Sequence, residues 1–148
     1  MPRIILRTKV QGTPTDIISR FDRQLFNYLL PPPWVLRVNT FEGSKPGDRV
    51  KAEFLFPYKA RFEVEIFSEQ ITDRECWFTD EGHKLPFGLT YWKHKHRFIA
   101  DGACCIISDE IDFRTTYLLQ ELFFRIVFRS VFSARKPKYR KYFGNCGG

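Results

Sequence analysis

The stretch that decides the fold reads Tyr91-Trp-Lys-His-Lys-His-Arg-Phe98, then Ile-Ala-Asp-Gly-Ala103, then Cys104-Cys-Ile-Ile-Ser-Asp-Glu-Ile-Asp-Phe113. In its first part, apolar or imidazole side chains alternate with basic ones, which is the period of two of a half-buried strand. Asp101-Gly102 suits the two central positions of a type I′ turn, because both need positive φ. The last part is again rich in β-branched and apolar residues. The sequence therefore predicts a β-hairpin over residues 91–113.

A two-residue turn at Asp101-Gly102 also predicts the register of the hairpin. Ala100 would pair with Ala103, and His94 would lie directly opposite Asp109, with Cβ atoms roughly 4.5–5.5 Å apart. His96 lies two residues on and shares their face. The hairpin is therefore expected to carry two histidines and an acid on its inner face.

Three interpretations of these polar side chains stay open. His94 and Asp109 can act as an acid–base pair, because a carboxylate raises the pKa of a neighbouring imidazole. They can also form a satisfied polar pair that stabilises the hairpin or meets a ligand. A metal site would need His94, His96 and Asp109 to converge. Cys105 lies on the same face but two pairs from Asp109, which gives little support to nucleophilic chemistry.

Working outward, alternating residues predict further strands at 3–11, 34–41, 50–56, 61–66 and 74–79, with residues 80–86 as a loop. A helix is expected to begin at Thr13-Pro14, where Thr13 can cap and Pro14 suits the first helical position. Pro31-Pro32-Pro33 ends that helix. The last helix covers 116–134, and Pro137 kinks or ends it.

The last helix has an unusually wide apolar surface. Glu121, Arg125 and Arg129 form one narrow polar stripe at i, i+4 spacing, and apolar residues fill most of the remaining circumference. We therefore expect the helix to be covered on several sides. Because the chain lacks βαβ alternation, an antiparallel sheet wrapped around this helix is the architecture favoured. Phe and Trp lining the space between them predict an apolar cavity.

Composition sets the remaining expectations. The chain of 148 residues suits one domain over 1–143, followed by a flexible tail at 144–148. Neither a long apolar run nor a signal peptide is present, so we expect a cytoplasmic protein. The cysteines lack CxxC spacing, which argues against a cysteine zinc site and favours small core residues at Cys76, Cys104 and Cys105, with an exposed thiol at Cys146.

The net charge of +7 is concentrated near the end of the chain, where five basic residues lie between Arg135 and Lys141. This stretch can be a solvated helix end, or it can contact an anionic membrane together with Phe124, Phe128 and Phe132. Nucleic acid is disfavoured, because basic residues on the strands alternate with acidic ones and no recognition motif is present.

Several motifs resemble those of the ligand-binding SRPBCC proteins, which belong to the START and birch-pollen-allergen superfamily and include polyketide cyclase-like members. Leu85-Pro86-Phe87 resembles the family's Gly-Pro-Phe, with leucine in place of glycine and a loop about two residues longer. His94-Lys-His-Arg-Phe98 resembles its His-x-His-x-Phe, and Asp101-Gly102 with Asp109-Glu110 resembles its Asp-Gly and later Asp-Glu. Thr13-Pro14-Thr15-Asp16 resembles its proline-containing start of the first helix.

The resemblance implies an α+β helix-grip fold, in which a curved seven-stranded antiparallel sheet surrounds a long C-terminal helix. It also implies a cavity for a lipid, isoprenoid or polyketide-like molecule, with the protein acting as carrier or sensor. The alternative is a cyclase or dehydratase that uses His94 and Asp109 as acid and base. No cofactor and no metal are expected. The residues expected to line the ligand site are Phe54, Phe62, Val64, Phe78, Trp92, His94, His96, Phe98, Cys105, Ile107, Asp109, Leu122, Phe123 and Ile126.

Overall fold

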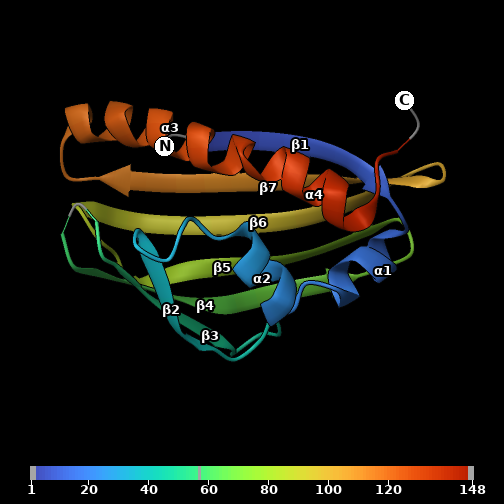
Figure 1. Cartoon of the computed structure of the whole chain (residues 1–148), viewed down its shortest axis with the longest axis horizontal. Helices are drawn as coiled ribbons and strands as arrows, with labels where there is room; N and C mark the ends of the chain where they lie inside the picture. The colour runs from blue at the N-terminus through green and yellow to red at the C-terminus, as the bar shows by residue number, and fades with distance from the viewer. Residues whose placement is uncertain (1–2, 57, 147–148) are drawn as a thin grey trace.

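The computed structural model describes residues 3–56 and 58–146. Seven strands form one antiparallel sheet in the order β1-β7-β6-β5-β4-β3-β2, which confirms the predicted α+β helix-grip fold (Figure 1). The elements are β1 Arg3–Gln11, α1 Pro14–Ser19, α2 Arg23–Leu29, β2 Leu36–Phe41, β3 Arg49–Phe54, β4 Ala60–Ile71, β5 Glu75–Lys84, β6 Leu89–Asp101, β7 Cys104–Thr115, α3 Leu118–Ser133 and α4 Arg135–Phe143.

All four helices lie on one side of the curved sheet (Figure 1). α3 packs on β1 and β7, α4 packs on β1, and α1 packs on β5 and β6. The strands can support this layer because their inward residues are buried and mostly apolar. Along β6, for example, Trp92, His94, His96 and Phe98 are buried while the intervening basic residues are only half-buried. The side of the sheet that faces the helices is called the concave face below.

The first helical segment is two helices rather than one. Thr13 caps α1 as predicted, since its hydroxyl accepts from the backbone N–H of Asp16. The chain then breaks, and the side chain of Asp22 caps α2 by accepting from the N–H of Leu25. The helical spacing of apolar residues continues past Asp22 and predicted one helix. Because Asp22 can cap a new helix, a second helix begins after it.

Residues 80–84, which we expected to form a loop, continue strand β5. Asp80 pairs with Ile66, and Gly82 pairs with Val64. Asp usually favours turns because its side chain competes for backbone groups. Here the Asp80 carboxylate is buried and bound by side chains of β6 instead, so the residue remains in the strand.

The hairpin forms where predicted, but its register is wrong by two residues. Asp101 pairs with Cys104, so the central turn positions are Gly102 and Ala103. Gly102 has φ 61 whereas Ala103 is not among the residues with positive φ, a pattern that fits a type II′ turn with Gly first. Asp109 therefore lies opposite His96. A shift of two residues keeps every side chain on its predicted face.

The last helix is covered on one side only, which corrects the expectation that it would be covered on several. Phe124 and Phe132 are buried and Phe128 is half-buried, at i, i+4 and i+8. They face the sheet and are not available to a partner. The helix ends at Ser133, and Pro137 lies in the first turn of α4, where a missing N–H is tolerated.

Residues 144–146 are attached to the sheet and its hairpin rather than free. The N–H of Gln11 donates to the carbonyl of Gly144, and Asn145 bridges to Val10. Cys146, expected as an exposed thiol, forms a disulfide with Cys104 across a Cα–Cα distance of 6.1 Å. Disulfides persist mainly in oxidising compartments, and the expected cytoplasmic location stays a prediction. Residues 147–148 of the expected tail lie outside the described residues.

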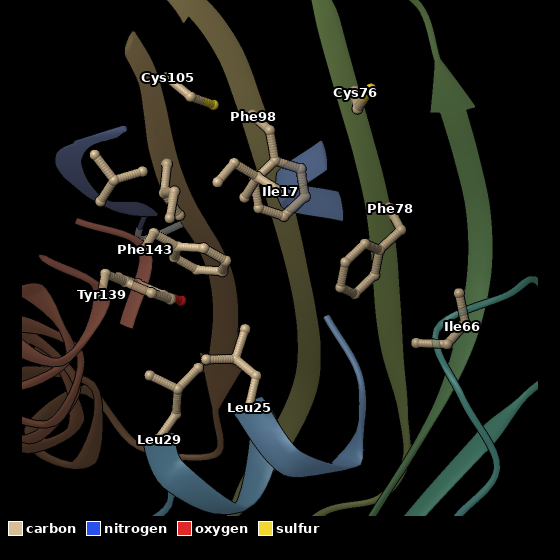
Figure 2. Close-up of a cluster of buried hydrophobic side chains, with 12 residues drawn as sticks. Ile17, Leu25, Leu29, Ile66, Cys76, Phe78, Phe98, Cys105, Tyr139 and Phe143 are labelled. Carbon is tan, nitrogen blue, oxygen red and sulfur yellow. The ribbon is translucent and has the colours of Figure 1, made fainter. Parts of the chain in front are cut away.

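The core divides into two clusters on the concave face. The α4-side cluster joins Phe78 and Phe98 of the sheet to Leu25, Tyr139 and Phe143 of the helices (Figure 2). The α3-side cluster contains Trp92, Phe113, Phe124 and Phe132, with half-buried aromatic residues around them. Within the described residues, no helix is long and apolar enough to cross a membrane.

Candidate functional site

Four buried polar side chains from three neighbouring strands meet on the concave face. Nε2 of His94 lies 2.9 Å from Oδ1 of Asp109, and Nε2 of His96 lies 3.0 Å from Oδ2 of Asp80. The two imidazole rings are 3.7 Å apart between centroids. This set of Asp80, His94, His96 and Asp109 is called the polar network below. The His94–Asp109 contact runs diagonally between the two strands, because the residue directly opposite Asp109 is His96.

Residues outside the network hold its two carboxylates in place. The indole N–H of Trp92 donates to Oδ1 of Asp80 at 2.9 Å, and the hydroxyl of Tyr139 donates to Oδ2 of Asp109 at 3.2 Å. Tyr139 comes from α4, so the hydrogen bond ties this helix to the sheet. Each carboxylate therefore has a defined orientation, which is the arrangement expected of a preorganised site.

Burial and charge set the protonation states. Burial and the neighbouring His94 lower the pKa of His96 to about 4, so His96 is neutral at physiological pH. Burial acts to raise the pKa of Asp109, but the hydrogen bond with His94 and the charge of Arg135 contribute to lowering it to about 2. For Asp80, burial is likewise outweighed, chiefly by His96, and the pKa is lowered. Two carboxylates thus remain ionised within the core.

Burial and the charge of Asp109 also raise the pKa of Tyr139, so its hydroxyl keeps its proton and remains a donor. Burial raises the pKa of Cys105 to about 12, which leaves the thiol protonated and unreactive. A nucleophilic role for Cys105 is therefore disfavoured, as it was by its predicted position two pairs from Asp109.

The polar network contacts both core clusters. The His96 ring stacks on Phe78 at 4.3 Å, and the His94 ring meets the edge of Phe132 at 5.0 Å. On the α3 side, Trp92 is surrounded by Phe62 at 5.3 Å and Phe128 at 5.2 Å. The network is thus the polar centre of an otherwise aromatic concave face.

The aromatic side chains toward the β5–β6 loop are only half-buried, in contrast to the rest of the concave face. Phe54, Phe62, Phe87 and Phe128 keep part of their surface exposed. Phe87 has φ 57, a conformation that is strained for a bulky residue. That conformation places its ring 5.2 Å from Phe54 and 5.0 Å from Tyr58. These four half-buried residues are called the aromatic rim below.

Most of the predicted ligand-site residues do lie on the concave face, but they are divided between the two core clusters. Phe78, Phe98, Cys105 and Ile107 belong to the α4-side cluster. Those on the α3 side are Phe62, Val64 and Trp92, with Phe54 joined to them through Phe62.

The three ligand-site residues predicted from α3 do not face the sheet. Leu122, Phe123 and Ile126 lie on the outer side of the helix, with exposed fractions of 48%, 62% and 68%. The inward positions belong to Phe124, Phe128 and Phe132.

Sequence reasoning missed Asp80 and Tyr139. Asp80 stands in a polar run with a glycine, which is typical of a loop, and Tyr139 stands in the basic stretch. A usable signal existed for Asp80, because it follows the alternating residues Cys76 and Phe78 on the same strand face. For Tyr139 no signal indicated contact with β7.

The apolar cavity predicted between the sheet and the last helix stays a prediction. A depression of about 260 Å³ occurs at the outer face of β3–β5, and it includes none of the predicted ligand residues. Its lining is mostly charged, with Lys51, Glu53, Arg61, Glu63 and Lys84 as its ionic residues.

Comparison with known proteins supports the fold. Protein Ms6760 from Mycobacterium smegmatis superposes with a TM-score of 0.66 at 16% identity, covering 99% of this chain and 93% of that one. Norcoclaurine synthase from Thalictrum flavum, solved with dopamine and hydroxybenzaldehyde, gives 0.61 at 12% identity, covering 93% and 84%. Ginseng major latex-like protein 151 from Panax ginseng gives 0.55 at 16% identity, covering 91% and 97%. No protein-family model and no curated sequence matches the chain. The chain therefore shares the fold of these proteins.

Proposed function

We propose that this protein binds an apolar small molecule, such as a lipid, isoprenoid or polyketide-like compound, at the aromatic rim of its concave face. The observation that carries the proposal is the partial exposure of the rim beside a fully buried polar network. Ligand sites are mostly apolar with a few fixed polar groups that orient the ligand. The rim would hold the apolar body, and the side of the network toward Trp92 would meet a polar end.

The shared fold supports this proposal by analogy. Norcoclaurine synthase has been solved with dopamine and hydroxybenzaldehyde, two small aromatic compounds. Its identity to this chain is 12%, so the analogy extends to the architecture and not to individual residues.

The geometry favours a carrier or sensor over a cyclase or dehydratase. An acid–base histidine has to present a ring nitrogen to its substrate. Both nitrogens of His94 face carboxylates instead, Nε2 toward Asp109 at 2.9 Å and Nδ1 toward Asp80 at 3.8 Å. We therefore favour binding as the role of the site.

Replacing one rim phenylalanine should weaken binding of an apolar probe. Phe62→Ala removes an aromatic contact with the site and is expected to raise the Kd of N-phenylnaphthylamine about twofold to twelvefold, which corresponds to a contact of about 0.5–1.5 kcal/mol. Phe67→Ala is the matched control, because Phe67 lies on the same strand and is 63% exposed. Fluorescence titration measures both constants. Weaker binding in the Phe67 variant alone would place the probe elsewhere and contradict the proposal.

A specific observation also favours docking on an anionic membrane. The outer side of α3 presents large apolar residues, with Leu119 80% and Phe123 62% exposed. The adjoining α4 contains five basic residues and no acidic one. An exposed apolar helix face beside cationic side chains fits an interface with anionic lipid. A second copy of the chain fits less well, because symmetrical packing would bring the basic helices together.

Membrane docking should depend on that outer face. Phe123→Glu is expected to abolish cosedimentation with phosphatidylserine-containing vesicles, since it places a charge in the apolar contact. Phe67→Glu changes an exposed phenylalanine on β4 and should leave cosedimentation unchanged. Wild-type binding should also weaken as salt rises. Equal binding to neutral phosphatidylcholine vesicles, or insensitivity to Phe123→Glu, would contradict this role.

A further inference from the structure

One side of the polar network brings together three potential metal ligands. Oδ2 of Asp80 lies 3.0 Å from Nε2 of His96 and 3.8 Å from Nδ1 of His94. One donor atom from each residue can be chosen so that all three lie within 4.8 Å of one another. All three residues are buried, with exposed fractions of 7% for Asp80, 8% for His96 and 3% for His94. The third histidine of the chain, His83, lies outside the cluster.

One ring nitrogen of the polar network, Nδ1 of His96, has no hydrogen-bond partner among the residues that the structure describes. A neutral imidazole has one N–H and one lone pair. If His94 donates from Nε2 to Asp109, the lone pair on Nδ1 faces the oxygen of Asp80. If His96 donates from Nε2 to Asp80, its Nδ1 has no hydrogen-bond partner in the described part of the chain. Unpaired polar atoms at this depth are uncommon and call for an explanation.

We propose that Asp80, His94 and His96 bind a divalent transition-metal ion of the Zn²⁺ type. Zinc bonds to nitrogen and carboxylate oxygen are about 2.0–2.2 Å long, so tetrahedral ligand atoms lie roughly 3.3–3.5 Å apart. The two separations at Asp80, 3.0 and 3.8 Å, lie on either side of that range. Metal binding would therefore require each of these two separations to change by a few tenths of an ångström.

The surrounding residues match the usual outer layer of such a site. Metal-bound histidines normally donate their other N–H to a carboxylate. His94 does so toward Asp109, and His96 would do so after its hydrogen moves to Nδ1, which lies 3.6 Å from the same oxygen. The indole N–H of Trp92 donates to Oδ1 of Asp80, the carboxylate oxygen that does not face the histidines, and so orients this carboxylate. A dication would also balance the charges of Asp80 and Asp109, and each of these ring nitrogens would then have a partner.

Three protein ligands are the number found where zinc keeps a position for water or a bound molecule. The proposal extends the proposed function, because a polar group of the ligand could take that position. It does not depend on it, since metal binding is measured without any organic ligand.

Histidine ring signals of the wild-type protein provide the first test. After dialysis against EDTA, nitrogen-15-labelled protein is titrated with Zn²⁺ and followed by long-range proton–nitrogen spectra. The expected result is a shift of Nδ1 of His94 and Nε2 of His96 at one equivalent, with His83 unchanged. A shift confined to His83, or no shift at one equivalent, would overturn the proposal. No variant is needed, so folding defects cannot obscure the outcome.

Variants give the second test, with affinity measured by competition against a zinc indicator. Asp109→Asn is expected to weaken binding about 10–100-fold, because it alters a group that positions His94. Asp80→Asn and His96→Gln should weaken it further, and His83→Asn should have no effect. Near-ultraviolet circular dichroism establishes that each variant is folded. Loss of affinity in the His83 variant, with affinity retained in the His96 variant, would assign the zinc to the surface and refute the site.

The visible spectrum of bound Co²⁺ distinguishes this site from the buried thiols of Cys76 and Cys105. Nitrogen and oxygen ligands should give bands without thiolate charge transfer in the near ultraviolet. A thiolate band would show that the cysteines bind the ion and would contradict the assignment.

Discussion

Replacing Asp109 by alanine is expected to lower the free energy of unfolding by about 3–5 kcal/mol. The carboxylate is 2% exposed and accepts hydrogen bonds from both His94 and Tyr139. Its removal leaves these two buried donors without an acceptor, and it leaves the nearby Arg135 without the charge that it faces. Urea unfolding of the EDTA-treated protein, followed by circular dichroism, measures the change.

Asp112→Ala is the matched control on the same strand. Asp112 lies on the outer side of β7 and pairs with Arg3, whose side chain is 58% exposed. Such a surface pair is expected to contribute at most about 1 kcal/mol. If the two alanine variants unfolded with equal free energies, the polar network would not be the tightly held centre of the concave face.

The second large effect is expected from α3. Phe124→Ala should destabilise the protein by about 3–5 kcal/mol, because the ring is 6% exposed and packs in the α3-side cluster. The adjacent Phe123→Ala should change stability by no more than about 0.5 kcal/mol, because Phe123 points outward. The same urea experiment compares two identical substitutions one residue apart.

This pair of variants reports directly on the orientation of the helix. The opposite order of effects would mean that α3 is rotated and that Phe123 faces the sheet, as we expected from the sequence. Equal and large effects would mean that both faces of the helix are covered.

The helix shows why orientation could not be predicted. A helix that is apolar almost all round offers no polar face to identify its solvent side. Phe124, Phe128 and Phe132 form one suitable stripe, and Leu119, Phe123 and Ile126 form another of similar quality. Contacts with the sheet determine that the stripe of Phe124, Phe128 and Phe132 faces inward.

The hairpin shows the opposite case. Alternation along β6 and β7 was enough to place His94, His96 and Asp109 on one face, and the structure has them there. The turn type was not predictable, since Asp101-Gly102 and Gly102-Ala103 both offer acceptable central positions. The error of two residues therefore changed the partner of Asp109 and not the face on which it lies.

Asp80 marks the limit of local reasoning. Its sequence neighbours resemble a loop, and the groups that hold it in the strand, Trp92 and His96, come from another strand. Contacts between strands decide such a position, and no pattern along one segment reveals them. The sequence pattern therefore indicated three of the four members of the polar network and missed Asp80, which is one of the proposed metal ligands.

The central claim, that an apolar molecule binds at the rim beside the network, is tested most directly by the tryptophan indole signals. Trp92 lies in the rim region, whereas Trp77 lies on the outer face beneath Lys95, 4.5 Å from its ammonium group. Titrating nitrogen-15-labelled protein with N-phenylnaphthylamine should shift the indole N–H signal of Trp92 saturably and leave that of Trp77 unchanged. An unchanged Trp92 signal while the probe binds would contradict the account.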